Sequence, residues 1–153
     1  MSEEKIRSLG LTLPPAPPPA GSYRPAVLSG GFAFLSGQIS KDAEGEVTAG
    51  KIGSDLSLEQ GKAAARLAAL NVLSVIRHFM GLQAVEQVVR VVAYIQTAPD
   101  FHEISQVANG ASDLLMEVFG EKGLHSRSAV GMSSLPMNAA VELEVTLKVT
   151  GVR

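Results

Sequence analysis

The sequence predicts an α+β fold of two layers, in which two helices pack on one face of a mixed β-sheet. Two long segments repeat apolar residues at helical spacing, and short alternating or β-branched runs around them are typical of strands. The predicted order along the 153 residues is strand, strand, helix, strand, helix, strand, strand. Because no third helix is available for the other sheet face, we expect a second subunit to cover it.

Residues 1–20 are interpreted as an N-terminal extension. Residues 2–11 predict one or two helical turns, with Ile6 and Leu9 three positions apart. Residues 14–20, PPAPPPA, exclude helix interior and central strand because proline lacks the N–H donor. We predict a stiff polyproline II arm lying on the surface, and a ligand for a proline-binding module is the alternative.

Residues 26–28 and 32–36 predict a β-hairpin around the Ser29-Gly30-Gly31 turn, followed by a polar loop over 41–50. Residues 57–80 give the clearest helix, and its first four residues, Ser-Leu-Glu-Gln, match the capping box. Its alanine-rich apolar face would let the helix lie close to a sheet. The other face carries Lys62, Arg66, Ser74 and Arg77.

The second half of the chain continues the pattern. Residues 88–95, VVRVVAYI, predict a central strand. A second helix is predicted to begin with Asp100 as its N-cap and to end at glycines 120 and 123. Residues 126–132 and 140–149 predict the last two strands.

The composition argues against several classes of protein. A net charge of −2, a pI of about 5.9 and 5% aromatic residues disfavour a dedicated nucleic-acid binder. The lack of cysteine excludes disulfides, thiolate catalysis and cysteine-based zinc sites. With no apolar leader and no apolar run of about 18 residues, we expect no membrane span and a cytoplasmic location.

Motifs of several enzyme classes are absent from the sequence. It has no G-x-G-x-x-G, P-loop, G-x-S-x-G or H-E-x-x-H motif. His78, His102 and His125 lack ligand spacing, so no metal site is expected, and we predict that His102 and His125 are solvated.

The candidate chemistry lies in residues 124–146, LHSRSAVGMSSLPMNAAVELEVT, which predict two strands joined by a Leu-Pro turn. We expect this one strand pair to present both Arg127 and Glu142. Arg127 stands between small residues, and a guanidinium binds a carboxylate through two parallel hydrogen bonds. In the last strand Glu142 and Glu144 share one face, where a glutamate can hold a water as general base. A solvated strand face with Lys148 as the ionic partner is the alternative.

From about residue 23 to residue 149 the chain resembles the Rid family of YjgF-like reactive-intermediate deaminases, also labelled endoribonuclease L-PSP. The short motifs that carry the resemblance stand in family order: Gly-x-Tyr at 21–23, Ser-Gly-Gln at 36–38, the helix with Asn109, Arg-Ser-x-Val at 127–130, Leu-Pro at 135–136 and Val-Glu-Leu-Glu at 141–144. The cluster that begins at Arg127 is fairly specific, whereas each short motif alone is weak.

The resemblance implies a chorismate-mutase-like fold for residues 21–153, a homotrimer with sites in the clefts between subunits, and no cofactor. It implies hydrolysis of imines and enamines of small 2-imino acids, such as 2-aminoacrylate, to 2-keto acids and ammonia. By position, Arg127 would grip the substrate carboxylate and Glu142 would orient the attacking water. The implied substrate-binding positions are Tyr23, Ser36, Asn109 and Ala129.

The chain departs from the family pattern at several positions. The family's Gly-Pro-Tyr is Gly-Ser-Tyr here, its cysteine is replaced by Ala129, and a common glutamate by Gly131. The proline-rich arm and a longer loop over 41–56 are additions typical of a divergent branch. A trimer that binds a small carboxylate without turnover is therefore one alternative. RNA cleavage or translation inhibition is another, which the acidic pI disfavours.

Overall fold

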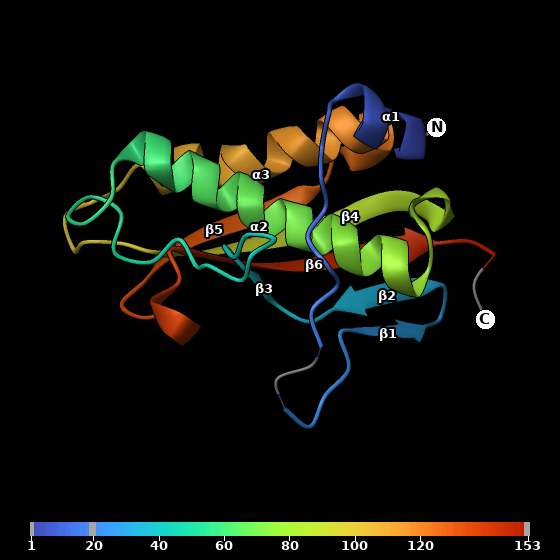
Figure 1. Ribbon diagram of the computed structural model, residues 1–153, viewed down its shortest axis with the longest axis horizontal. Helices are drawn as coiled ribbons and strands as arrows, with labels where there is room; N and C mark the ends of the chain where they lie inside the picture. The colour runs from blue at the N-terminus through green and yellow to red at the C-terminus, as the bar shows by residue number, and fades with distance from the viewer. Residues whose placement is uncertain (1, 19–20, 152–153) are drawn as a thin grey trace.

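The computed structural model describes residues 2–18 and 21–151 (Figure 1). Helices α2 (Leu58–Phe79) and α3 (Ile104–Phe119) lie side by side over one face of a six-stranded mixed sheet. The predicted two-layer α+β architecture is confirmed. No helix of the described residues is long and apolar enough to cross a membrane.

The strands of the sheet are β1 (Ala26–Ser29), β2 (Phe32–Leu35), β3 (Gln38–Ile39), β4 (Val85–Gln96), β5 (Ser126–Met132) and β6 (Val141–Val149). Their order is β1-β2-β6-β4-β5, with β3 paired to one end of β6. The pair β4–β5 is parallel, and the other pairs are antiparallel. The sequence missed the two-residue β3 and placed the start of β4 three residues late.

Helix α2 begins as its sequence predicts. The Ser57 hydroxyl accepts from the Gln60 N–H at 3.1 Å, and the Gln60 side chain accepts from the Ser57 N–H at 2.8 Å. The predicted N-cap of α3 is wrong, because α3 begins at Ile104 and Asp100 does not cap it. The Phe101 N–H instead donates to Ala98 at 3.1 Å, so this segment forms a turn before the helix starts.

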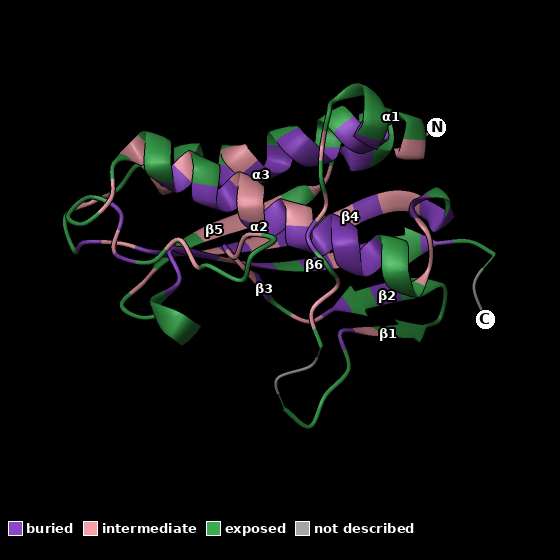
Figure 2. Ribbon diagram, viewed as in Figure 1, coloured by how far each residue is buried: buried purple, intermediate pink, exposed green. Residues whose placement is uncertain are grey.

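The core lies between the sheet and α2 and α3 (Figure 2). Along β6, buried Val and Leu residues alternate with Glu142, Glu144, Thr146 and Lys148 on the opposite face. We call that opposite face the open face, since no described helix covers it (Figure 1). It also carries exposed apolar side chains on the strands paired with β6 and on their neighbours: Val27, Phe32, Phe34 and Val130.

The N-terminal segment begins with helix α1 (Ser2–Ser8), which confirms the predicted helical turns. Ile6 is 2% exposed and belongs to the core cluster, whereas Leu9 is exposed. The chain then runs across α2 (Figure 1). Pro14 is buried, whereas Pro15 and Pro18 are exposed, so the predicted surface arm is packed at its start and exposed farther on. The end of the predicted polyproline stretch, residues 19–20, lies outside the described residues.

Candidate functional site

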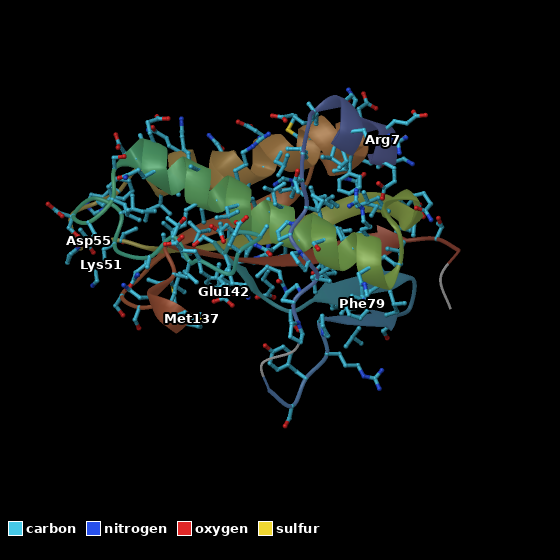
Figure 3. The ribbon with its side chains drawn as sticks, in the orientation of Figure 1. Arg7, Lys51, Asp55, Phe79, Met137 and Glu142 are labelled. Carbon is cyan, nitrogen blue, oxygen red and sulfur yellow. The ribbon has the colours of Figure 1, made fainter. Side chains whose placement is uncertain are left out.

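Glu142 lines a cavity of about 250 Å³ below the sheet. We call this space the Glu142 cavity. In Figure 3 Glu142 and Met137 lie close together on the side of the sheet away from α2 and α3. The other walls of the cavity include Tyr23, Ile39 and the proline-rich arm, and Lys41 and Asn71 contribute polar side chains to the lining. One carboxylate therefore lies beside a mostly apolar space large enough for a small organic molecule.

The Glu142 carboxylate rests on the backbone of the Ser36-Gly37-Gln38 turn. A Cβ atom at Gly37 would collide with Glu142 Oε1, so a residue with a side chain would push this carboxylate away. Ile39 of β3 is paired with Glu142 in the sheet. The Ser-Gly-Gln motif thus has a physical reason, because glycine at its centre lets the carboxylate approach the chain closely.

Burial raises the pKa of Glu142 above the usual glutamate value, and the negative charge of Glu144 raises the pKa further. Its side chain is half-buried, and among the described residues no cation forms a salt bridge with it. A carboxylate with a raised pKa is a stronger base than an ordinary glutamate. This property suits a group that must take a proton from water.

Tyr94 of β4 lies opposite Glu142 in the sheet and connects it to Glu144. The Tyr94 hydroxyl donates to Glu144 Oε1 at 2.8 Å, and this bond is the main cause of the raised pKa of Tyr94. Both carboxylates and Tyr94 line a second cavity of about 390 Å³ on the open face, together with Ser36. Tyr94 therefore stays protonated and keeps Glu144 in place next to Glu142.

Lys148, predicted to be the ionic partner of this strand face, pairs with another residue. Lys148 Nζ lies 2.8 Å from Glu86, so it does not neutralise Glu142 or Glu144. The interpretation of a solvated face paired to Lys148 is wrong for Glu142, which is half-buried.

Arg127 of β5 is held by side chains and backbone of α3. Its Nη1 donates to Asn109 Oδ1 at 2.8 Å and to Ser112 Oγ at 3.0 Å, and its Nη2 donates to the Ser105 carbonyl at 3.3 Å. A guanidinium has five N–H donors, so two of them remain without a partner in the described chain. Two donors are what a carboxylate needs for a bidentate pair.

His125 completes this group, which we call the Arg127 cluster: Arg127, Ser105, Asn109, Ser112 and His125. One ring nitrogen of His125 lies 2.6 Å from the Gly123 carbonyl and the other lies 2.9 Å from Ser112 Oγ. Since the carbonyl can only accept, the first nitrogen carries the proton and the second accepts from Ser112. The prediction that His125 is solvated is therefore wrong.

The Glu142 cavity and the Arg127 cluster lie on opposite faces of the sheet within one chain. Arg127 pairs with Val91 and Glu142 pairs with Tyr94. Positions 91 and 94 are three positions apart along β4, so their side chains point to opposite faces. The expectation that one strand pair presents both groups is wrong, because β4 lies between β5 and β6.

The four predicted substrate-binding positions divide between the two places. Tyr23 lines the Glu142 cavity, and Ser36 lines the neighbouring one while its hydroxyl donates to the Arg24 carbonyl at 2.6 Å. Asn109 binds Arg127, and Ala129 lies two residues beyond Arg127 on the same face of β5. The structure thus shows where each residue lies, and their roles toward a substrate stay predictions.

Sequence reasoning missed two buried polar residues of α2 that support the site. Asn71 Nδ2 donates to the carbonyls of Ile39 at 3.3 Å and Lys41 at 2.7 Å, which fixes the chain beside the Glu142 cavity. Ser74, predicted on the exposed face of the helix, is buried and donates to the Pro14 carbonyl. Asn71 lies among apolar neighbours in the sequence, and that contrast was the signal available.

Met137 was also missed, although it follows directly after the Leu-Pro motif. Met137 and Asn138 adopt left-handed backbone with φ of 58° and 57°, which is uncommon for residues other than glycine. The Gln96 side chain donates to Asn138 Oδ1 at 3.0 Å and the Gly50 N–H donates to the Asn138 carbonyl at 2.9 Å. These bonds hold the turn that places Met137 at the Glu142 cavity.

Comparisons with known proteins agree with the fold described above. The model of a family described as YjgF/chorismate mutase-like, with a candidate endoribonuclease activity, matches residues 3–147. Protein TCP17 of Trypanosoma cruzi is 42% identical over 145 residues, which cover 94% of this chain and 91% of that protein. The 2-iminobutanoate/2-iminopropanoate deaminase of Dermatophagoides farinae is 31% identical over 145 residues, which cover 94% of this chain and 95% of that protein. The crystal structure of Atu1372 from Agrobacterium tumefaciens, of unknown function, is 34% identical with a TM-score of 0.88, covering 97% of this chain and 93% of that one.

Proposed function

This chain belongs to the YjgF/chorismate mutase-like family, and on that premise we propose that it is a deaminase. The proposed reaction is hydrolysis of small 2-imino acids and their enamine forms, such as 2-aminoacrylate, to 2-keto acids and ammonia. The observation that carries the proposal is the half-buried Glu142 carboxylate, with its raised pKa, beside a mostly apolar cavity. The named deaminase relative supports the same chemistry.

In the proposed reaction Glu142 holds the attacking water and takes a proton from it as the water adds to the C=N carbon. Glu142 gives this proton to the nitrogen, and the product is a carbinolamine that carries OH and NH2 on the former C=N carbon. Glu142 then transfers the hydroxyl proton to the nitrogen as the carbonyl forms, and the C–N bond breaks to release ammonia. The raised pKa of Glu142 suits both steps, because the same group must accept a proton and give it back. No cofactor or metal is required for this hydrolysis.

Arg127 is proposed to bind the substrate carboxylate through its two remaining N–H donors. Asn109 and Ser112 hold the guanidinium in one orientation, so the plane of the bound carboxylate is also set. Binding of this kind fixes the position of the C=N carbon relative to the water.

Arg127 and Glu142 can act on one substrate only if two copies of the chain meet. We therefore propose a homotrimer in which β5, an edge strand, of one copy lies near the open face of the next. The exposed apolar side chains of the open face, such as Val27 at 50% and Phe34 at 48%, support a subunit contact there. A cytoplasmic location is part of the same proposal.

A coupled assay tests the proposed activity. An amino-acid oxidase generates 2-imino acids in the presence of semicarbazide, which traps them, and hydrolysis by the protein lowers the yield of semicarbazone. We expect the protein to lower this yield for at least the smallest substrates. No change over buffer for any amino acid would exclude the deaminase, and sedimentation of a monomer at working concentration would exclude the shared cleft.

Binding of a small carboxylate without turnover is the second candidate, and Gly131 favours it. A Cβ atom at this position would lie 2.9 Å from Thr97 Oγ1 and 3.1 Å from Ile104 Cδ1, so the glutamate common in the family would require these side chains to move. A thermal-shift screen of 2-keto acids separates the candidates, because a binder is stabilised by ligand without consuming imine. RNA cleavage gains no support from a chain of net charge −2.

A further inference from the structure

The N-terminal arm is anchored to α2 at several points along its length. Glu3 of α1 forms a two-bond ion pair with Arg77, at 2.9 Å and 2.8 Å. Ile6 is buried in the core, and the Pro14 carbonyl accepts from buried Ser74. An arm held by a core residue and a buried hydrogen bond has a defined path over the helix.

The arm is stiff beyond its last anchor. The pyrrolidine ring fixes φ near −65° at each proline of the arm: Pro14, Pro15, Pro17 and Pro18. The direction of the chain at Pro14 therefore restricts where Pro17 and Pro18 can lie. At about 3.1 Å per residue in an extended proline-rich segment, Pro18 lies roughly 12 Å farther on.

The arm ends at the Glu142 cavity. Pro17 and Pro18 line this cavity together with Glu142, Ile39 and Met137. On its other side the arm borders a groove formed with residues 41–45. Lys41 and Asn71 line both spaces, as Pro17 and Pro18 do. The two prolines form an apolar wall of the space beside the candidate base.

We propose that Pro17 and Pro18 limit the length of the substrate side chain that the Glu142 cavity admits. This inference rests on the proposed function: the C=N carbon must lie beside Glu142, while the substrate carboxylate points toward Arg127 of another copy. The side chain then occupies the remaining space, whose walls are the pyrrolidine rings, Ile39 and Met137. These four walls are apolar, whereas Gln38, Lys41 and Asn71 supply the polar part of the lining. A substrate side chain directed at the prolines meets apolar groups, so the preferred substrates are 2-imino acids with apolar side chains.

The test compares two substrates in three proteins. An amino-acid oxidase generates the imines of alanine and norleucine, and hydrolysis is followed by semicarbazide competition in the wild type, the double variant Pro17→Ala/Pro18→Ala and the control Pro15→Ala. Pro15 is exposed and borders only the groove on the far side of the arm, so the control removes a proline ring outside the cavity. We expect the double variant to raise the ratio of kcat/KM for norleucine imine over alanine imine about tenfold, the scale of one or two methylene groups in an apolar pocket. The control should leave this ratio unchanged.

If the arm only stabilises the fold, the double variant should change kcat/KM for both imines by the same factor. An unchanged ratio in the double variant, or an equal shift of the ratio in the control, would overturn the inference but not the proposed deaminase activity. If the wild type hydrolyses no imine, the proposed function fails, and the inference is then decided by affinities for pyruvate and 2-ketohexanoate measured by calorimetry. If the ratio of affinities for 2-ketohexanoate over pyruvate rises about tenfold in the double variant alone, the result supports the proposal that Pro17 and Pro18 limit side-chain length. Equal affinities in all three proteins, or no binding, would overturn it.

Discussion

The Glu142 cavity and the Arg127 cluster each present one candidate catalytic group, and the chain supports the two groups in opposite ways. Glu142 lies against a glycine turn and apolar walls, and burial raises its pKa. Arg127 is surrounded by polar partners on α3 that fix its orientation with three hydrogen bonds. The comparison teaches that the base is tuned by removing water, whereas the anion binder is oriented by hydrogen bonds.

The largest effect is expected from Glu142→Gln, which keeps the size of the side chain and removes the base. Activity should fall by about 10²- to 10⁴-fold, the usual contribution of general acid–base catalysis. The measurement is kcat/KM on an imine made in the assay. Glu144→Gln is the matched control on the same strand, and a loss of equal size there would mean that the base has been assigned to the wrong carboxylate.

Arg127→Ala should lower kcat/KM by about 10²- to 10³-fold, because two charge-assisted hydrogen bonds to the substrate carboxylate are lost. The circular dichroism spectrum should keep its shape, since the guanidinium lies at the sheet edge. Arg66→Ala is the matched control, because Arg66 also binds an α3 side chain, Glu117, at 3.3 Å on the outer surface. Full activity of Arg127→Ala would remove Arg127 from the site.

The pH dependence follows from the raised pKa of Glu142. The carboxylate form is the base, so kcat/KM should fall as pH drops through this raised pKa, at a higher pH than the usual value of 4.5 for glutamate. The contribution of Glu142 to the stability of the fold changes with pH in the opposite direction. A raised folded-state pKa stabilises the chain below the unfolded-state pKa, and this stabilisation is lost as pH rises.

Thermal melts of the wild type and Glu142→Gln at several pH values measure this effect on stability. The variant should be the more stable protein at neutral pH, and its advantage should shrink as the pH is lowered. An advantage that does not depend on pH would show that burial does not tune Glu142.

The smallest effect concerns the helix starts. Ser57→Ala should lower the free energy of unfolding by about 1 kcal/mol, because it removes the hydroxyl that accepts from the Gln60 N–H. Asp100→Ala should change it by less than about 0.5 kcal/mol, since Asp100 caps no helix in the structure. Urea denaturation measures both free energies of unfolding. A loss above about 0.5 kcal/mol for Asp100→Ala would indicate that Asp100 caps α3, as the sequence predicts.

Much of the fold was predictable because its signals are local. The capping box at Ser57 and the alternation around Glu142 each depend on residues a few positions apart. The two-residue strand β3 gave no such signal, since it is a strand only because β6 lies beside it. The Asp100 cap failed for a different reason, because a local turn, closed by the Phe101 N–H and the Ala98 carbonyl, forms before α3 begins.

The sequence by itself determined which side chains are candidates for chemistry, and it determined that Glu142 and Glu144 share a strand face, because side-chain alternation is a property of one strand. Only the tertiary structure decided that β4 lies between β5 and β6, that Arg127 faces α3, and that the arm reaches the Glu142 cavity. Strand order and arm docking depend on burial between segments far apart in the chain. Such burial depends on contacts across the whole fold, and a short stretch of sequence gives no information about those contacts.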